Sequence, residues 1–244
     1  ERISFQPAMA NIPKIVFFDI DGTLLRSQDG HVAFNDAILK TFGIPGDIRT
    51  IRPDGKTDPI ILQEIFDVAG HDVEWGQADL ETFSRNLQEC YTRAISEGPT
   101  RVRALAGVPE LVRELSRLPD LSLGVVTGNM EVTARLKLQA AGVGEHIGPG
   151  AFGSDSANRN DLPRIAMERW SAYLGVPVEP GHCVIVGDTP RDLEAARSNG
   201  MKCLLVATGR YNPLEELRKI EPDELLADFS DTRAAVEALM GLFG

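Results

Sequence analysis

The sequence predicts an α/β protein whose doubly wound parallel sheet is interrupted, soon after its first strand, by an all-helical insertion. Short apolar runs alternate with amphipathic segments from residue 100 onwards, and helical periodicity fills residues 27–99. Alternating strands and helices indicate a parallel sheet that is covered on both faces. We therefore expect an α/β core of residues 1–26 and 100–244 and a helical cap domain of residues 27–99.

The first strand is the apolar run from Ile15 to Phe18, which two acidic residues, Asp19 and Asp21, follow. Its β-branched and aromatic side chains are typical of a buried strand of a parallel sheet. Carboxylates at the end of such a strand are costly to bury unless they bind a cation or take part in chemistry. A plain Asp-Gly turn after the strand is the alternative interpretation.

The insertion contains three segments with helical spacing of apolar residues. The first helix is expected before Gly43, and the second has Thr57 or Asp58 as its N-cap and a proline at its start. No strand is predicted between Asp21 and Leu121, and Arg26 to Gly30 is interpreted as a linker. The expected helices are residues 32–42, 59–68 and 80–95.

The remaining core elements follow from the change of hydrophobic period after residue 100. Short apolar runs predict strands, and longer amphipathic stretches predict helices that cover them. The expected strands are residues 121–126, 151–152, 183–186, 203–206 and 225–227. The expected helices are residues 108–118, 131–141, 162–174, 193–198, 215–220 and 232–242.

Composition narrows the possible partners. The 244 residues carry a formal net charge of -11, which argues against a nucleic-acid or anionic membrane surface as the main partner. An anionic substrate would then need a local cluster of cations. No apolar run approaches the ~20 residues that span a bilayer. The sequence gives no indication of an oligomeric state.

Cysteine usage and the N-terminus favour a cytoplasmic protein. The three cysteines, Cys90, Cys183 and Cys203, lie in apolar segments without a Cys-x-x-Cys pair, so we expect reduced core residues. The stretch before Lys14 has no apolar segment of the kind found in signal peptides. Met9 is a candidate natural start, which would make residues 1–8 an extension.

Polar side chains follow three of the predicted strands at the point where each strand ends. In an open parallel sheet the carboxyl ends of the strands meet at one crevice, so these groups are expected to lie together. Taken alone, the Thr-Gly-Asn run is equally typical of a helix cap. The residues are Asp19 and Asp21, then Thr127, Gly128 and Asn129, then Asp188 and Asp192.

This set of residues suits phosphoryl transfer. Mg²⁺ prefers oxygen ligands, which Asp19 and Asp188 can supply together with a backbone carbonyl near Asp21. Asp19 would attack phosphorus as a nucleophile, and Asp21 would act first as general acid and then as general base. The Thr127 hydroxyl and nearby backbone N–H groups, including those of Gly128 and Asn129, would hold phosphoryl oxygens.

The run Asp19-x-Asp21-Gly-Thr-Leu resembles the first motif of the haloacid dehalogenase-like hydrolases. Thr127 matches the second motif of that family, and Asp188 with Asp192 matches the fourth. The resemblance implies a Rossmann-like core and a Mg²⁺-dependent phosphatase that forms an aspartyl-phosphate. It implies that Asp188 binds the metal and that Asp192 braces the metal shell, although Asp192 alone is also typical of a helix N-terminus.

The third family motif supplies a cation near the phosphoryl group, and here the sequence departs from the usual pattern. No Lys-Pro pair follows Phe152. Arg159, just before the helix at Leu162, resembles the arginine of some relatives, whereas Arg164 is expected to face solvent from within that helix. We favour Arg159.

The run Arg52-Pro-Asp-Gly-Lys56-Thr57-Asp58-Pro59, here called the cap loop, contains a Gly-Lys-Thr-Asp stretch that resembles the substrate loop of phosphoglycolate phosphatase-like members. It combines two cations, a glycine and a helix N-terminus, an arrangement that suits an anion. The resemblance implies a small anionic phosphorylated substrate, with 2-phosphoglycolate as the nearest example. A plain helix-capping turn is the alternative interpretation. The candidate specificity residues are Arg52, Lys56 and Thr57.

Three other functions stay open on the sequence. A sugar-phosphate mutase would use the same pair of aspartates but would need a cap that holds a bisphosphate intermediate. Dehalogenation and phosphonate cleavage are disfavoured because Asp21 is acidic in this chain. A catalytically inactive binding domain is disfavoured because each of the expected acids is present.

Overall fold

The structure, a computed structural model, describes residues 13–243, and the candidate start at Met9 lies outside them. Six parallel strands form one sheet in the order β5-β4-β1-β6-β7-β8. Strand β1 is central, so the polar residues after it lie between those after its neighbours, β4 and β6. The strands are β1 (Lys14–Phe18), β4 (Leu121–Val126), β5 (Gly150–Ala151), β6 (Cys183–Gly187), β7 (Lys202–Val206) and β8 (Glu224–Leu226).

Helices cover both faces of this sheet, as the doubly wound prediction requires. Val16 and Phe18 of β1 pack with residues of α4, α5 and α9, whereas Ile15 and Phe17 pack with residues of α6, α7 and α8. This alternation is the period of two that a strand imposes on its side chains. The helices are α4 (Val108–Leu115), α5 (Glu131–Ala140), α6 (Leu162–Leu174), α7 (Pro190–Ser198), α8 (Leu214–Lys219) and α9 (Thr232–Gly241).

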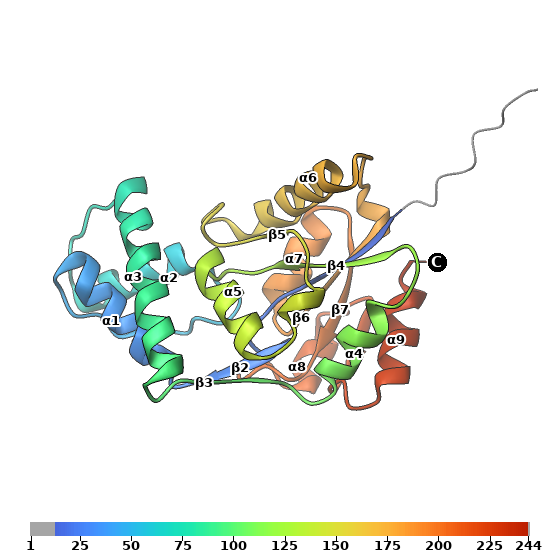
Figure 1. The fold of residues 1–244 in the computed structure, drawn as a ribbon, viewed down its shortest axis with the longest axis horizontal. Coiled ribbons are helices and arrows are strands. Elements are labelled where there is room, and N and C mark those ends of the chain that lie inside the picture. Colours follow the sequence, from blue (N-terminus) through green and yellow to red (C-terminus); the bar gives the residue numbers. More distant parts are fainter. Residues whose placement is uncertain (1–12, 244) are drawn as a thin grey trace, which may run out of the picture.

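The inserted helices form a separate layer beside the sheet (Figure 1). They are α1 (Gly30–Phe42), α2 (Asp58–Ala69) and α3 (Gln77–Ser96), and their buried side chains make an apolar cluster that extends to Met130 of the core. The predicted end of α1 is confirmed, because Gly43 adopts φ 70° there and its N–H binds the Leu39 carbonyl. Short 3₁₀ helices lie at Ile48–Thr50, Gly144–His146, Arg159–Asp161 and Pro180–His182.

The prediction that no strand occurs between Asp21 and Leu121 is wrong. Strands β2 (Leu25–Gln28) and β3 (Arg101–Ala104) form an antiparallel pair at the two ends of the insertion. The interpretation of Arg26 to Gly30 as a linker is wrong for the same reason. The two strands are short and polar, and only Leu25 is fully buried, so they lack the apolar pattern that marks a core strand.

The other predicted elements are confirmed, with ends that differ by a few residues. The helix expected over residues 108–118 ends at Leu115, because the chain turns there to enter β4. The helix expected over residues 193–198 begins three residues earlier, at Pro190, a position that suits proline. Among residues 13–243, no helix combines the length and apolar character needed to span a bilayer.

Candidate active site

The chain leaves regular strand geometry directly after β1. Asp19 still donates its backbone N–H to the Val186 carbonyl of β6, at 2.8 Å. A tight turn then follows, in which Gly22 adopts φ 89°, a conformation that glycine accepts without strain. This turn lets both acids reach one crevice: Asp19 is buried, the Asp21 side chain is 42% exposed, and both line the same cavity.

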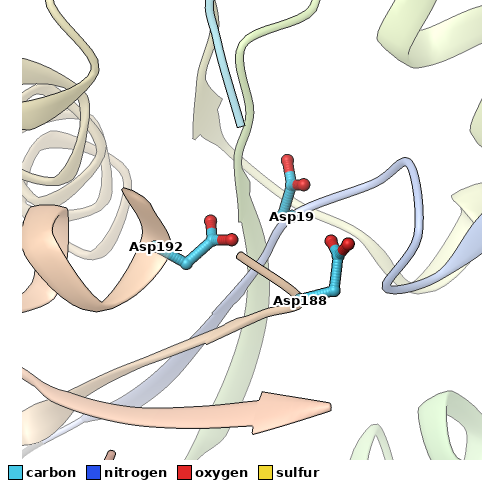
Figure 2. A group of neighbouring side chains, drawn as sticks. All are labelled: Asp19, Asp188 and Asp192. Atoms are coloured by element: carbon cyan, nitrogen blue, oxygen red, sulfur yellow. The ribbon is translucent and has the colours of Figure 1, made fainter. Parts of the chain in front are cut away.

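Three buried carboxylates meet at the ends of β1 and β6. One carboxylate oxygen from each of Asp19, Asp188 and Asp192 lies within 4.8 Å of the other two. Figure 2 shows the three side chains as neighbours. Burial, with added repulsion from Asp192 and Asp19, raises the pKa of Asp188 well above its ordinary value. Burial also raises the pKa of Asp19, although the positive charge of Arg159 opposes this shift.

This group of carboxylates has the chemistry of a divalent-cation site. Mg²⁺ takes oxygen ligands, which carboxylates supply. The Oδ1 of Asp188 accepts a hydrogen bond from Thr23 Oγ1 at 3.1 Å. The backbone approaches this acid closely, since a Cβ at Gly209 would lie 2.0 Å from Asp188 Oδ2. Like charges this close favour either protonation or a bound cation, so the residues fit the ion that the sequence predicts.

Asp192 has a different environment from Asp188. Its Oδ2 accepts hydrogen bonds from the backbone N–H of Thr189, at 3.0 Å, and from the Thr189 hydroxyl, at 2.7 Å. Its Oδ1 accepts from Arg159. The carboxylate therefore braces both the loop after β6 and the neighbouring arginine.

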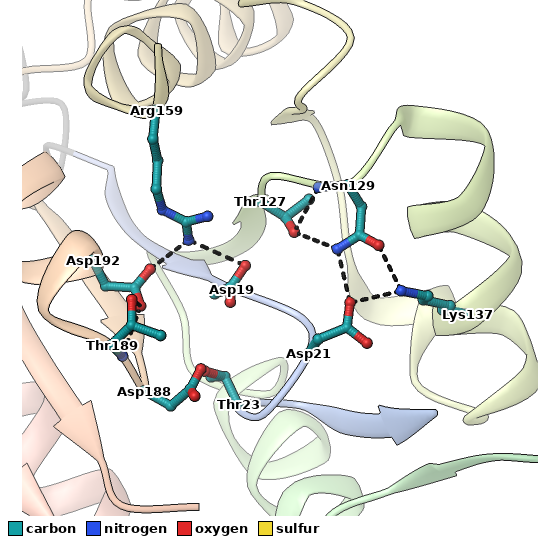
Figure 3. A network of polar contacts seen from close by, with 10 residues as sticks. All are labelled: Asp19, Asp21, Thr23, Thr127, Asn129, Lys137, Arg159, Asp188, Thr189 and Asp192. Atoms are coloured by element: carbon teal, nitrogen blue, oxygen red, sulfur yellow. Dashed lines mark hydrogen bonds and ion pairs between the residues drawn. The ribbon is translucent and has the colours of Figure 1, made fainter. Parts of the chain in front are cut away.

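Of the two arginines considered for the third motif, only Arg159 lies in the site. Its guanidinium contacts both Asp19 and Asp192 (Figure 3). Nη2 is 3.2 Å from Asp19 Oδ1 and 2.5 Å from Asp192 Oδ1, and the side chain is 8% exposed. Its buried Nε has no hydrogen-bond partner within residues 13–243. Arg164 is 57% exposed and pairs with Glu168 on the same helix.

The run after β4 supplies the opposite wall of the site. The buried Thr127 hydroxyl accepts a hydrogen bond of 2.9 Å from Asn129 Nδ2. The Asn129 amide also donates to Asp21 Oδ2, at 2.9 Å, so this side chain orients the acid (Figure 3). Gly128 lies against the cap, where a Cβ would stand 2.0 Å from the Lys56 carbonyl oxygen.

Lys137 is a member of the site that the sequence pattern did not reveal. Its Nζ lies 2.7 Å from Asp21 Oδ2 and 2.6 Å from Asn129 Oδ1. Burial opposes its charge, but Asp21 and Tyr91 outweigh that effect and hold the pKa of Lys137 above its usual value. The sequence spacing could have indicated its burial, because Lys137 lies four residues after Thr133 and so on the same, buried face of α5.

Asp58, a buried acid, is the second residue whose part in the site was not foreseen. It is the first residue of α2 in the cap, and its carboxylate accepts a hydrogen bond of 2.7 Å from the backbone N–H of Met130. Met130 is the N-cap of α5, so a cap side chain binds a core helix terminus. Burial raises the pKa of Asp58 to about 6, against the attraction of Lys137.

The three cap candidates occupy different places. Lys56 lines the cavity and pairs with Glu64 of α2. Arg52 is not among the described residues that line it. The guanidinium instead binds Asp54 at 2.7 Å and Asn212 at 2.9 Å, and lies over the Tyr211 ring.

Thr57 also binds the core rather than the cavity. It is the N-cap residue of α2, as predicted, but its hydroxyl donates to the Ala157 carbonyl at 2.7 Å. Arg52 and Thr57 therefore connect the cap loop to the core. The cavity that this loop closes has a volume of about 970 Å³ and is lined by residues of both layers.

Comparisons with known proteins match this architecture along most of the chain. Residues 13–200 match the family model of haloacid dehalogenase-like hydrolases. Phosphoglycolate phosphatase from Synechococcus elongatus is 29% identical over 233 residues, which cover 92% of this chain and 98% of the relative. Validoxylamine A 7'-phosphate phosphatase from Streptomyces hygroscopicus subsp. limoneus is 25% identical, covering 90% of this chain and 96% of that one.

A solved structure shares the fold. The predicted phosphoglycolate phosphatase from Haemophilus somnus superposes with a TM-score of 0.66 at 22% identity, covering 94% of this chain and 100% of that chain. The family match includes the polar ends of β1, β4 and β6, where Asp19, Thr127 and Asp188 lie. The protein therefore belongs to the haloacid dehalogenase-like hydrolases.

Proposed function

We propose that the protein is a Mg²⁺-dependent phosphatase that hydrolyses a small phosphorylated metabolite through an aspartyl-phosphate on Asp19. One observation carries the proposal: buried Asp19 lies beside two further carboxylates and 3.2 Å from the guanidinium of Arg159. A buried acid with an adjacent cation and a cation-binding group of oxygens suits attack on a phosphoryl group.

The carboxylates of Asp19 and Asp188, with the backbone carbonyl of Asp21, would hold Mg²⁺. When bound, the ion supplies positive charge that offsets the repulsion between the anionic nucleophile and the phosphoryl oxygens. Asp192 would keep its contacts with Thr189 and Arg159 and so brace this shell from behind.

In the first step, a carboxylate oxygen of Asp19 forms a bond to phosphorus while the bond from phosphorus to the leaving oxygen breaks. Asp21 gives a proton to that leaving oxygen, which departs as an alcohol. Arg159 and the Thr127 hydroxyl stabilise the charge that develops on the phosphoryl oxygens.

In the second step, water attacks the phosphorus of the aspartyl-phosphate and Asp21 takes one of its protons. The bond between phosphorus and Asp19 breaks, inorganic phosphate leaves, and both carboxyl groups return to their starting state. The cap excludes bulk water from the cavity during the first step.

We propose 2-phosphoglycolate as the first substrate to test. The support is the name of the Synechococcus relative together with Lys56, a cap cation on the cavity wall that suits a second anionic group. The Streptomyces relative is named for a larger phosphate ester, and the cavity of about 970 Å³ has room for substrates of that size as well.

A phosphate-release screen over phosphorylated metabolites, with Mg²⁺ or with excess EDTA, tests the proposal. We expect phosphate release in the assays with Mg²⁺ and none in those with EDTA. Asp19→Asn should lower kcat at least about a thousandfold. Asp36→Asn is the matched control, since Asp36 lies on the cap and is half exposed.

Two results would contradict the phosphatase. Full phosphate release by the Asp19→Asn variant would exclude Asp19 as the nucleophile. Conversion of a sugar phosphate into its positional isomer, without free phosphate, would identify a mutase instead.

A further inference from the structure

The buried ammonium group of Lys137 donates hydrogen bonds to Asp21 and to Asn129, and Asn129 itself donates to the same Asp21 oxygen. Lys137 Nζ is 2.7 Å from Asp21 Oδ2 and 2.6 Å from Asn129 Oδ1, and Asn129 Nδ2 donates to that same Oδ2 at 2.9 Å. The three side chains form a closed triangle (Figure 3). A buried lysine is rare without such pairing, so this triangle accounts for its burial.

The triangle treats the two oxygens of Asp21 differently. Oδ2 accepts from two donors, whereas Oδ1 has no hydrogen-bond partner within the described part of the chain. A proton on Oδ2 would point at the Lys137 ammonium or the Asn129 amide. A proton carried by Asp21 is therefore held at Oδ1, on a side chain that lines the cavity.

The cap completes this environment. The ring of Tyr91, on α3, lies 5.5 Å from Lys137 Nζ, within the range of a cation–π contact. Only 7% of the Lys137 side chain is exposed. Lys137 therefore contacts both Asp21 of the core and Tyr91 of the cap, next to the cavity.

We propose that Lys137 is a positioning residue which, with Asn129, fixes Asp21 Oδ2 and so presents Oδ1 to the leaving oxygen of the substrate. This inference rests on the phosphatase reaction proposed above. Fixed orientation matters most when the leaving group needs a proton, since general acid catalysis typically contributes about 10²–10⁴-fold to such a step.

The inference predicts a dependence on the leaving group. Lys137→Met keeps the length of the side chain and removes its charge and donors. We expect kcat/KM to fall about 10–100-fold for the best alkyl phosphate of the screen, whose alkoxide needs a proton. For p-nitrophenyl phosphate, whose leaving group departs without one, we expect a change of less than about threefold.

The ratio of the two kcat/KM values is the decisive quantity. Unfolded enzyme lowers both values equally, so the ratio is unaffected by any loss of stability in the variant. kcat/KM also reports only the steps up to release of the alcohol, which excludes hydrolysis of the aspartyl-phosphate. Lys40→Met is the matched control, because Lys40 lies half exposed on α1 and pairs with Glu89.

A double-mutant cycle with Asp21→Ala separates positioning from substrate binding. If Lys137 acts through Asp21, Lys137→Met should cause less than about a twofold further loss in the Asp21→Ala background. An undiminished loss there would overturn the inference, because Lys137 would then act on the substrate itself.

Other outcomes are equally clear. Equal losses for both phosphate esters, or none for the alkyl ester, would overturn the inference while leaving the phosphatase intact. Absence of phosphate release by the wild-type protein would overturn the phosphatase, and the inference with it.

Discussion

The backbone N–H of Asp58, the first residue of α2 in the cap, donates a hydrogen bond of 2.8 Å to the carbonyl of Gly128 in the core. The two backbone segments lie very close at this point, because a Cβ at Gly128 would be 2.0 Å from the Lys56 carbonyl oxygen. The cap therefore docks on the loop that also carries Thr127, so we expect closure of the cavity and the geometry of the proposed phosphoryl site to be coupled.

We expect Gly128→Ala to impair this docking. The added methyl group meets backbone rather than a flexible side chain, so the cap loop must move away. KM for the best substrate should rise at least about tenfold, since a displaced loop no longer closes the cavity. Steady-state kinetics checks this, with Gly181→Ala as control, because a Cβ at Gly181 would meet no heavy atom within 4 Å among residues 13–243, apart from those of its own chain neighbours. Equal kinetics for the two variants would contradict the coupling.

Arg159 and Arg164 should differ sharply when each is replaced by alanine. Arg159→Ala removes the cation between Asp19 and Asp192, so kcat should fall about 10²–10³-fold. The free energy of unfolding should fall by about 3–5 kcal/mol, because two buried acids lose their partner. Arg164→Ala removes an exposed ion pair and should change stability by less than about 1 kcal/mol.

Kinetics well below the melting temperature and urea unfolding measure these two effects separately. The assignment of Arg159 to the phosphoryl site would fail if Arg164→Ala lost activity while Arg159→Ala kept it.

Replacement of the two cap-loop cations, Lys56 and Arg52, should affect KM to different extents. Lys56→Ala removes a charge on the cavity wall, so KM should rise about tenfold with little change in kcat. Arg52→Ala removes the hydrogen bonds to Asp54 and Asn212 but no group that lines the cavity, so KM should rise less than about threefold. Initial rates over a range of substrate concentrations separate the two parameters. A larger effect at Arg52 than at Lys56 would place the substrate elsewhere.

The metal-free protein should lose stability as pH rises. The pKa of Asp188 is raised in the folded state, so the folded protein binds more protons than the unfolded chain above about pH 4. The stability present at low pH is then lost as pH rises towards the folded-state pKa of Asp188. Mg²⁺ binds the ionised carboxylates, so it should raise the melting temperature more at pH 8 than at pH 5.

Thermal unfolding across this pH range, with EDTA or with Mg²⁺, provides the measurement. Asp188→Asn removes one of the titrating groups and should weaken the pH dependence in EDTA, while Asp19 and Asp58, whose pKa values are also raised, keep part of it. A melting temperature that rises with pH in EDTA would argue against uncompensated burial of this acid.

Local patterns in the sequence were enough for most of the fold. The apolar runs that became β1, β4, β6 and β7 are short and almost entirely buried, and such runs can be recognised in the sequence without knowledge of their neighbours in the fold. Helix ends carried their own signals, as at Gly43. The β2–β3 pair escaped prediction because its stability comes from pairing between distant segments, Leu25–Gln28 and Arg101–Ala104, rather than from an apolar pattern.

The acids of the site were also predictable, because parallel topology brings the ends of neighbouring strands together whatever their separation in sequence. That rule places Asp19, Asp188 and Asp192 at one edge of the sheet, and their oxygens do meet there. It also places Thr127 and Asn129 beside Asp21.

The sequence also pointed to Arg159 as the cation beside those acids, but tertiary structure alone decided the places of the other charged residues. Arg52 and Lys56 are close in sequence, but packing sends one to Asn212 and the other to the cavity. Lys137 reaches the site from one face of α5, and Asp58 from the first position of α2 in the cap. The local sequence does not indicate the partners of either residue. A charged side chain takes its role from the groups it meets when buried, and that depends on how cap and core pack together.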